Sequence, residues 1–330
     1  MHGGSVHDRL AALEGAEAAL VLGSGMAAIS STMLALLRAG DHLVASSWLF
    51  GEARRFFEHE LPSVGIEVTF VDPTETRGWR RLTRNNTRLF FIASPVNPTT
   101  RVADLNPPRL LAQELGIALV VDSTCASPIN FRPIEHGADV VIHSSAMYLL
   151  GDHGVETGVV CGAEALIDEV RARMWSWGHA PDEASIALLE RDLQTLEIRV
   201  QRQNTNAMQV AAWAETHPAI RRVYYPGLRS HPDHESAMAL LDGYGALIML
   251  DLRDGAASAA RVAHALRLFR RTPQLGGVNS RVHPLWHTIE HDAARPPVDL
   301  AFELGDGAIR LSIGLEDPAD LIADLTQALE

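Results

Sequence analysis

Short apolar runs recur along this chain and are separated by polar stretches that contain glycine or proline. They cover residues 42–46, 65–71, 87–93, 117–122 and 138–142, and each is the size of a strand. The run that ends in Asp122 is uninterrupted, a pattern typical of parallel strands buried on both faces of a sheet. The pattern therefore predicts several strands of a central, mostly parallel sheet.

Helical patterns lie between these runs. Residues 5–15 place Leu10 and Leu13 on one apolar stripe, and Gly15 fits a C-terminal cap. Residues 16–41 predict a strand, a Gly-Ser-Gly turn and a long helix, and residues 107–115 predict another helix. Strands that alternate with helices favour an α/β fold, in which helices cover both faces of the sheet.

The second half of the chain begins with a predicted helical region over residues 163–203. We place a domain boundary near Asn204, because long helices of this kind often join a large domain to a smaller one. This divides the chain into a large domain of residues 1–203 and a C-terminal α/β domain of residues 204–330.

The composition narrows the classes of function. The net charge is −13 and no basic stripe is visible, which argues against a nucleic-acid partner. No apolar run is long enough to span a membrane, and the N-terminal residues have no apolar signal core. Cys125 and Cys161 lie in apolar contexts and predict packing rather than a disulfide, so a cytoplasmic location is expected. All 28 basic residues are arginine, and lysine does not occur.

Polar groups gather where predicted strands end. The stretch IHSSAMYLLGDH, residues 142–153, follows a strand-like run and carries hydroxyls, a thioether, a phenol and two histidines. Open α/β sheets keep their ligands at the carboxyl ends of strands. The Gly-Ser-Gly turn before the first long helix is a ready anion site, because backbone N–H groups point outward there.

These motifs together resemble a known family. GSGMAAI, SPVNPTT, VVDSTCASP, HSSAMYLLGDH and RLSIG occur in the order seen in the pyridoxal-phosphate (PLP) enzymes of cysteine and methionine metabolism. That family includes cystathionine γ-synthase, cystathionine lyase and methionine γ-lyase. The resemblance covers nearly the whole chain and implies the fold-type I PLP fold.

The resemblance also implies roles for individual residues. Gly25, Met26 and Ser144 would hold the cofactor phosphate, and Phe50 would stack on the ring. Asp122 would pair with the pyridinium nitrogen and keep the ring an electron sink. The further residues that the resemblance implies are Asn97 on the ring oxygen, Thr124 in the cofactor site and Arg310 on the substrate α-carboxylate.

Departures from the family cluster at the same site. Met147 occupies the position of the lysine that forms the Schiff base, so standard Schiff-base catalysis is excluded. Ala146 replaces a phosphate-binding threonine, Phe50 replaces a tyrosine, and Gln274 replaces a serine. The family's N-terminal arm, which carries a Tyr-x-Arg pair, is expected to be missing.

Two further groups of residues allow metal binding or acid–base chemistry. His283, His287 and His291 are four residues apart, with Glu290 adjacent, and could ligate a metal on one helix face, although Pro284 interrupts the run. A separate set of acid–base candidates lies near the Met147 position: His143, Tyr148, Asp152 and His153.

Three functions remain open from the sequence. In the first, the chain binds PLP, an amino acid–PLP adduct or a related amino-acid-like ligand non-covalently and acts on it without the lysine link. Alternatively, it is a catalytically dead pseudoenzyme that pairs with an active relative. The third possibility is unrelated acid–base or metal chemistry in the pocket that holds PLP in the family. A homodimer or tetramer is expected, or a hetero-oligomer with an active paralogue.

Overall fold

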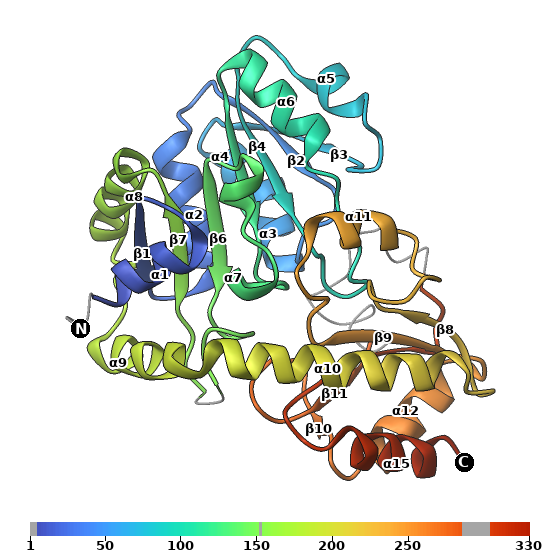
Figure 1. The fold of residues 1–330 in the computed structure, drawn as a ribbon. Coiled ribbons are helices and arrows are strands. Elements are labelled where there is room, and N and C mark those ends of the chain that lie inside the picture. The colour runs from blue at the N-terminus through green and yellow to red at the C-terminus, as the bar shows by residue number, and fades with distance from the viewer. Residues whose placement is uncertain (1–4, 152–153, 286–303) are drawn as a thin grey trace.

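A computed structural model describes residues 5–151, 154–285 and 304–330 of the chain. These residues form two sheets, each in its own part of the chain, with helices packed around them (Figure 1).

The first sheet has seven strands in the order β1-β7-β6-β5-β4-β2-β3. Strands β2 to β6 run parallel to one another, whereas β7 is antiparallel to its neighbours β1 and β6. The sequence prediction of a mostly parallel sheet is therefore confirmed. The strand bounds are β1 Ala18–Leu22, β2 His42–Ser46, β3 Glu67–Val71, β4 Thr87–Ala93, β5 Ala118–Asp122, β6 Val140–Ser144 and β7 Gly158–Gly162.

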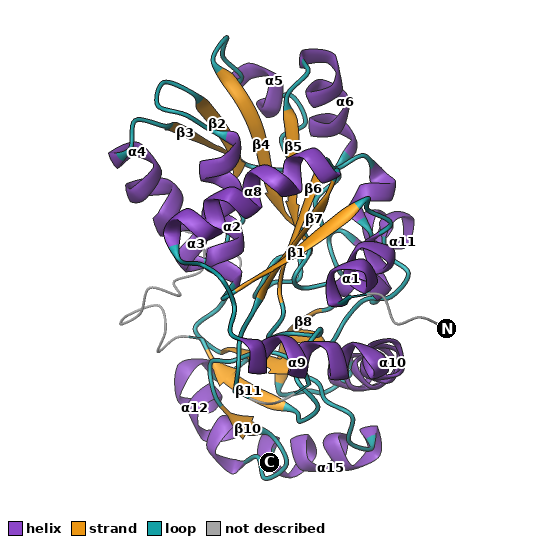
Figure 2. Ribbon diagram, turned by 90° about the vertical axis from the view of Figure 1, so that its left-hand side faces the viewer, coloured by secondary structure: helices purple, strands orange, loops and turns teal. Residues whose placement is uncertain are grey.

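Helices cover both faces of this sheet, as the alternating pattern predicted (Figure 2). One face packs against the helices α2 Gly25–Leu36, α3 Gly51–Arg55 and α8 Glu164–Trp177. The other face packs against α5 Gly78–Leu82, α6 Asn106–Leu115 and α11 His234–Leu240. The remaining short elements before α8 are α1 Val6–Glu14, a π-helix at Phe56–Glu60, α4 Leu61–Ser63, α7 Ser127–Asn130 and a 3-10 helix at Pro133–His136.

The region that the sequence predicted as helical, residues 163–203, contains a break. Gly178 ends α8 in the left-handed conformation, with a φ of 70° that favours glycine. Asp182 then caps α9, Glu183–Asp192, by accepting a hydrogen bond from the Ser185 N–H at 2.9 Å. After a 3-10 turn at Leu193–Thr195, α10 runs over Leu196–Glu215, so Asn204 lies inside a helix.

The second sheet has the strand order β10-β11-β12-β9-β8. Its strands are β8 Ile220–Tyr224, β9 Leu247–Leu252, β10 Arg270–Arg271, β11 Arg281–Pro284 and β12 Ala308–Ser312. The helices α12 Gly255–Ala265 and α15 Pro318–Leu329 pack beside it, and α10 lies between this sheet and the large one (Figure 1).

Helix α10 forms hydrogen bonds, as well as packing contacts, with segments next to both sheets. Arg199 donates to the backbone oxygens of Tyr148 at 2.7 Å and Leu149 at 3.3 Å. One turn further along, Gln203 donates to the backbone oxygen of Gly277 at 2.8 Å. The segment after β6 and the loop before β11 are therefore both held against the same helix. Among the described residues, the helices are too short or too polar to cross a membrane.

Candidate functional site

A cavity of about 420 Å³ opens where the large sheet meets the smaller one. Its wall includes residues that follow β4, β5 and β6 and residues of β11 and β12. The position agrees with the rule that ligands of open α/β sheets bind at the carboxyl ends of strands. The volume lies within the range of about 300–1,000 Å³ that is usual for small-molecule sites.

One wall of the cavity is the N-terminus of α2. Ser24 caps this helix by accepting from the Ala27 N–H at 3.0 Å. The N–H groups of Gly25 and Met26 have no acceptor in the described part of the chain, as expected in a first helical turn. Ser144 lies directly against this turn, since a Cβ at position 25 would stand 2.8 Å from the Ser144 Cβ. Backbone donors and the Ser144 side chain together form an anion cradle.

Gly158 allows this turn to lie so close to the sheet. A Cβ placed on Gly158 would stand 2.1 Å from the backbone oxygen of Ser24, well inside the closest permitted contact. Glycine at this position of β7 therefore allows the N-terminal turn of α2 to lie this close to the strand.

Asp122 lies at the end of β5 and is held in one orientation. Its Oδ1 accepts from the Thr124 N–H at 3.0 Å and from the Thr124 hydroxyl at 2.6 Å. The same hydroxyl oxygen accepts from the Ser144 N–H at 2.9 Å, which joins Asp122 to β6.

The second oxygen of Asp122 has no hydrogen-bond donor among the residues that the structure describes. The carboxyl group opens onto the cavity but is otherwise enclosed, and burial raises the pKa of Asp122. The Thr124 hydrogen bonds and the charge of His143 act in the opposite direction. A cationic N–H donor in the cavity would stabilise this carboxylate.

Arg310 on β12 forms the opposite wall. Its guanidinium donates to the Asn97 amide oxygen at 3.1 Å and to the backbone oxygen of Pro273 at 2.5 Å. The residue is only 6% exposed, and burial lowers the pKa of Arg310 to about 10. Its contacts within the described residues are neutral oxygens, with no carboxylate at ion-pair distance. A buried guanidinium on a cavity wall is suited to an anionic ligand.

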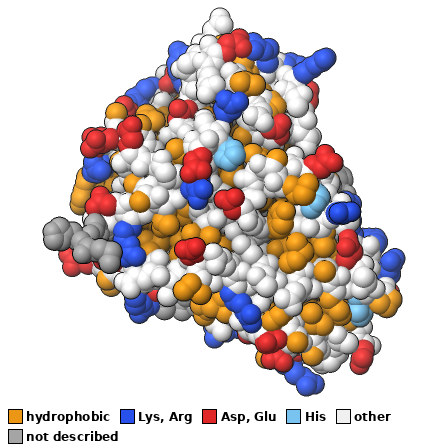
Figure 3. Space-filling view, in the orientation of Figure 1, with side chains coloured by type: hydrophobic (Ala, Val, Ile, Leu, Met, Phe, Trp, Pro, Cys, Tyr) orange, Lys and Arg blue, Asp and Glu red, His pale blue; other side chains and the backbone are white. Residues whose placement is uncertain are grey.

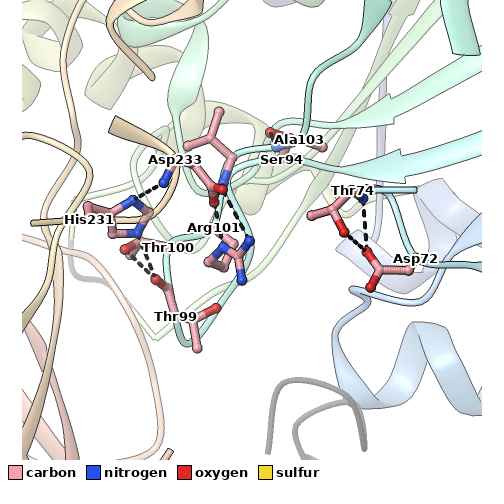
Figure 4. Close-up of polar contacts among 10 residues, drawn as sticks. Asp72, Thr74, Ser94, Thr99, Thr100, Arg101, Ala103, His231 and Asp233 are labelled. Atoms are coloured by element: carbon pink, nitrogen blue, oxygen red, sulfur yellow. Dashed lines mark hydrogen bonds and ion pairs between the residues drawn. The ribbon is translucent and has the colours of Figure 1, made fainter. Parts of the chain in front are cut away.

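Asn97 belongs to the loop after β4. Figure 4 shows contacts of Thr99 and Arg101 in this loop with His231 and Asp233 of the C-terminal half. Arg101 on this loop forms a buried ion pair with Asp233, with 2.5 Å between Nε and Oδ2. His231 lies 3.4 Å from the backbone oxygen of Thr99, and burial lowers the pKa of His231 to about 4. The loop that carries Asn97 is thus held at two points by one segment of the C-terminal half, residues 231–233.

Met147 and Phe50 make apolar parts of the cavity wall. Met147 is 2% exposed, and its backbone oxygen accepts from the Gly277 N–H at 3.1 Å. Phe50 precedes α3 and is 43% exposed. Ala146 also lines the cavity, and so does Gln274, whose side-chain oxygen accepts from Arg281 at 3.3 Å.

The structure thus brings most of the sequence-predicted site residues to one cavity. The residues that line it together are Gly25, Met26, Phe50, Asn97, Asp122, Thr124, Ser144, Ala146, Met147, Gln274 and Arg310.

Two acid–base candidates lie elsewhere. The Tyr148 oxygen accepts from the Ala246 N–H at 2.7 Å inside the protein core, and burial raises the pKa of Tyr148. The imidazole of His143 is 2.5 Å from the Glu14 carboxylate, and both side chains are buried away from the cavity. The His143 side chain points away from the cavity because alternate residues of β6 point to opposite faces of the sheet. Tyr148 lies in the turn after β6, and its side chain points into the core. Asp152 and His153 lie outside the described residues.

The proposed metal cluster also falls largely outside the described residues. His287, Glu290 and His291 are not described, whereas His283 is part of β11 and lines the cavity. In the described ranges, no three His, Cys, Asp or Glu side chains are grouped as a metal site would require.

Sequence reasoning did not place four residues on the cavity wall, namely Arg281, Cys125, Glu156 and His283, the last of which it named only as a candidate metal ligand. His283 stands directly opposite Arg310 in the β11–β12 register, a pairing that only the sheet reveals. Cys125 packs against the hydrophobic core, as the sequence predicts, and it also lines the cavity. Burial, with the charge of Asp122, raises the pKa of its thiol to about 12. Cys161 is fully buried, as expected for packing.

Acidic and basic side chains are dispersed over the face shown in Figure 3, and no basic stripe crosses that face.

Comparisons with known proteins place these features in context. Residues 4–330 match the family model described as Cys/Met metabolism PLP-dependent enzyme. The L-methionine gamma-lyase of Pseudomonas putida is 36% identical over 98% of this chain and 81% of its own length. The O-succinylhomoserine sulfhydrylase of Pseudomonas aeruginosa is also 36% identical, over 98% of this chain and 80% of its own length. The crystal structure of metB from Corynebacterium glutamicum superposes with a TM-score of 0.91 at 30% identity, covering 98% of this chain and 83% of that one.

Proposed function

Because this chain belongs to the Cys/Met metabolism PLP-dependent enzyme family and has its fold-type I architecture, we propose that it binds PLP, or an adduct of PLP with an amino acid, without a covalent bond. The observation that carries the proposal is that an anion cradle, a half-buried carboxylate and a buried guanidinium line one cavity. The chain has no lysine to supply the usual covalent link.

The residues present fit this cofactor. The N–H groups of Gly25 and Met26 and the Ser144 hydroxyl suit a phosphate group. The unbonded oxygen of Asp122 suits a protonated ring nitrogen, and Phe50 offers an aromatic face for the ring. When bound, PLP supplies an electron sink for changes at the amino-acid α-carbon.

The remaining side chains would orient the amino acid. Arg310 would hold its α-carboxylate by paired hydrogen bonds, and Asn97 holds the guanidinium in place for this task. Met147, in the position of the family lysine, leaves an apolar wall where an amine would otherwise stand. Binding would therefore rest on the phosphate cradle, Asp122 and ring packing, and the ligand would stay exchangeable by dialysis.

A spectroscopic titration tests the proposal. The purified protein is titrated with PLP, alone and with an L-amino acid, and the absorbance of bound cofactor is followed before and after dialysis. We expect saturable spectral changes that dialysis reverses, and weaker binding for Ser144→Ala than for the exposed control Ser176→Ala. A wild-type protein that gives no saturable change with PLP plus amino acid contradicts the proposal.

A second function is favoured by the apolar replacements at Met147 and Ala146 in the cavity wall. In this alternative the chain is a non-catalytic subunit that pairs with a lysine-containing relative instead of forming its own homodimer or tetramer. Light scattering of the protein alone, and of its mixture with such a relative, separates the two states. A hetero-oligomer combined with no PLP titration would favour this second function.

A further inference from the structure

His283 is the one imidazole on the cavity wall among the described residues. It belongs to β11, which pairs antiparallel with β12, and it stands directly opposite Arg310 in the register. Side chains that face each other across an antiparallel pair share one face of the sheet, with Cβ atoms about 4.5–5.5 Å apart. The imidazole therefore lies beside the guanidinium that would hold the substrate carboxylate.

Other titratable groups on the described cavity wall suit proton transfer at this point less well. Asp122 is fixed by Thr124 at the end of β5, on the large-sheet side of the cavity. The Cys125 thiol has a pKa of about 12 and keeps its proton at neutral pH. Glu156 is exposed on the segment before β7, on the large-domain side of the cavity, and not on the strand pair that carries Arg310.

Resting on the function proposed above, we propose that His283 removes and returns the α-proton of an amino acid whose carboxylate lies on Arg310. The α-carbon is bonded to the carboxylate carbon, so a ligand held by Arg310 places its α-hydrogen near the neighbouring side chain. Imidazole takes up and releases protons near neutral pH, which is the requirement for a general base and acid.

The proton transfer is balanced without any other reagent. The Cα–H bond would break as an N–H bond forms on the His283 imidazole, and PLP, when bound, would supply the sink for the electron pair left on the α-carbon. Return of a proton from the imidazolium to the α-carbon reverses the step. In D₂O the returned particle is a deuteron, so the expected activity is exchange of the α-hydrogen of an amino acid for deuterium.

The experiment uses the whole protein with PLP and L-alanine in D₂O, and follows loss of the α-hydrogen signal by proton NMR. Exchange by free PLP is subtracted. We expect His283→Asn to lower the protein-dependent exchange about 10²-fold or more, the usual contribution of a general base. Binding, measured by absorbance, should be retained, and added imidazole should restore part of the exchange. The matched control is His59→Asn, at an exposed position of the π-helix.

Each outcome decides a different point. Binding without exchange in the wild type, or unchanged exchange in His283→Asn, overturns the role of His283 and leaves the proposed function standing. A wild-type protein that binds no PLP overturns both. If His283→Asn does not fold, as judged by circular dichroism, His283→Gln is measured in the same way, and full exchange by this second variant also overturns the role.

Discussion

The Arg310 guanidinium donates to the Asn97 amide oxygen at 3.1 Å, although the two residues are 213 positions apart in the chain. Arg310 lies on β12 of the smaller sheet, and Asn97 lies on the loop that follows β4 of the large sheet. The hydrogen bond therefore joins the two parts of the chain at the cavity wall. It orients a buried cation whose hydrogen-bond acceptors in the described structure are neutral oxygens.

This relationship predicts how Arg310→Lys behaves. A lysine keeps the positive charge but lacks the planar guanidinium group. The paired hydrogen bonds to a carboxylate and the contact with Asn97 are therefore lost. We expect amino-acid binding to the PLP-loaded protein to weaken about 10- to 100-fold, since charged hydrogen bonds contribute about 1.5–3 kcal/mol. Titration of the absorbance with amino acid measures the change. PLP binding itself should be little altered, and equal weakening of both affinities would contradict the assigned role.

Met147→Lys tests whether the cavity still accepts a covalent cofactor link. Methionine and lysine are both unbranched, and Met147 already faces the cavity. We expect the variant to turn yellow with PLP and to retain the cofactor covalently after borohydride reduction, located by peptide mass spectrometry. Met238→Lys, on the exposed surface of α11, is the matched control, because it also introduces a single lysine. Labelling of the two variants to the same extent would show that position 147 has no special relation to the cofactor.

The loop that carries Asn97 depends on the buried pair of Arg101 and Asp233. Asp233→Asn removes the charge at nearly constant shape and leaves the Arg101 guanidinium without that carboxylate. Breaking one side of a buried pair costs about 3–5 kcal/mol, and we expect a loss of this size in the free energy of unfolding in urea. The exposed pair of Arg80 and Glu114 supplies the control, and Glu114→Gln should leave the midpoint unchanged. Equal midpoints for the two variants would refute the prediction.

His42 predicts a loss of stability in mild acid. Its ring lies between the Thr87 and Thr69 hydroxyls, at 2.8 and 2.9 Å, and burial lowers the pKa of His42 from 6.5 to about 4. The unfolded chain takes up this proton near pH 6.5, whereas the folded protein takes it up only near pH 4. The stabilising contribution of His42 is therefore present above pH 6.5 and is lost as the pH falls from 6.5 to 4.

Urea unfolding at several pH values measures this effect. Wild type should lose stability in that window with a slope up to about 1.4 kcal/mol per pH unit steeper than His42→Gln. Glutamine does not titrate and can still bond to both threonines. Identical slopes would show that His42 is not the titrating group, and His59→Gln, at an exposed position, should keep the wild-type slope.

Local sequence alone determined several strands and helices of the large domain. The predicted strand 87–93 coincides with β4, and Gly15 caps the first helix with a φ of 69°. These features follow from interactions between near neighbours in the chain, namely the burial of apolar runs and the capping of helix ends. Met147 and the absence of lysine were also visible from the sequence, because side-chain identity needs no coordinates.

Only the tertiary structure decided which side chains share the cavity. Tyr148 lies just after the strand that ends at Ser144. Its hydroxyl accepts a hydrogen bond from the Ala246 N–H in the core, whereas Ser144 faces the cavity. His283 faces the cavity beside Arg310 because of the register between β11 and β12. Residue type and spacing do not fix either placement, because the direction of a side chain depends on strand register and on long-range packing between the two sheets.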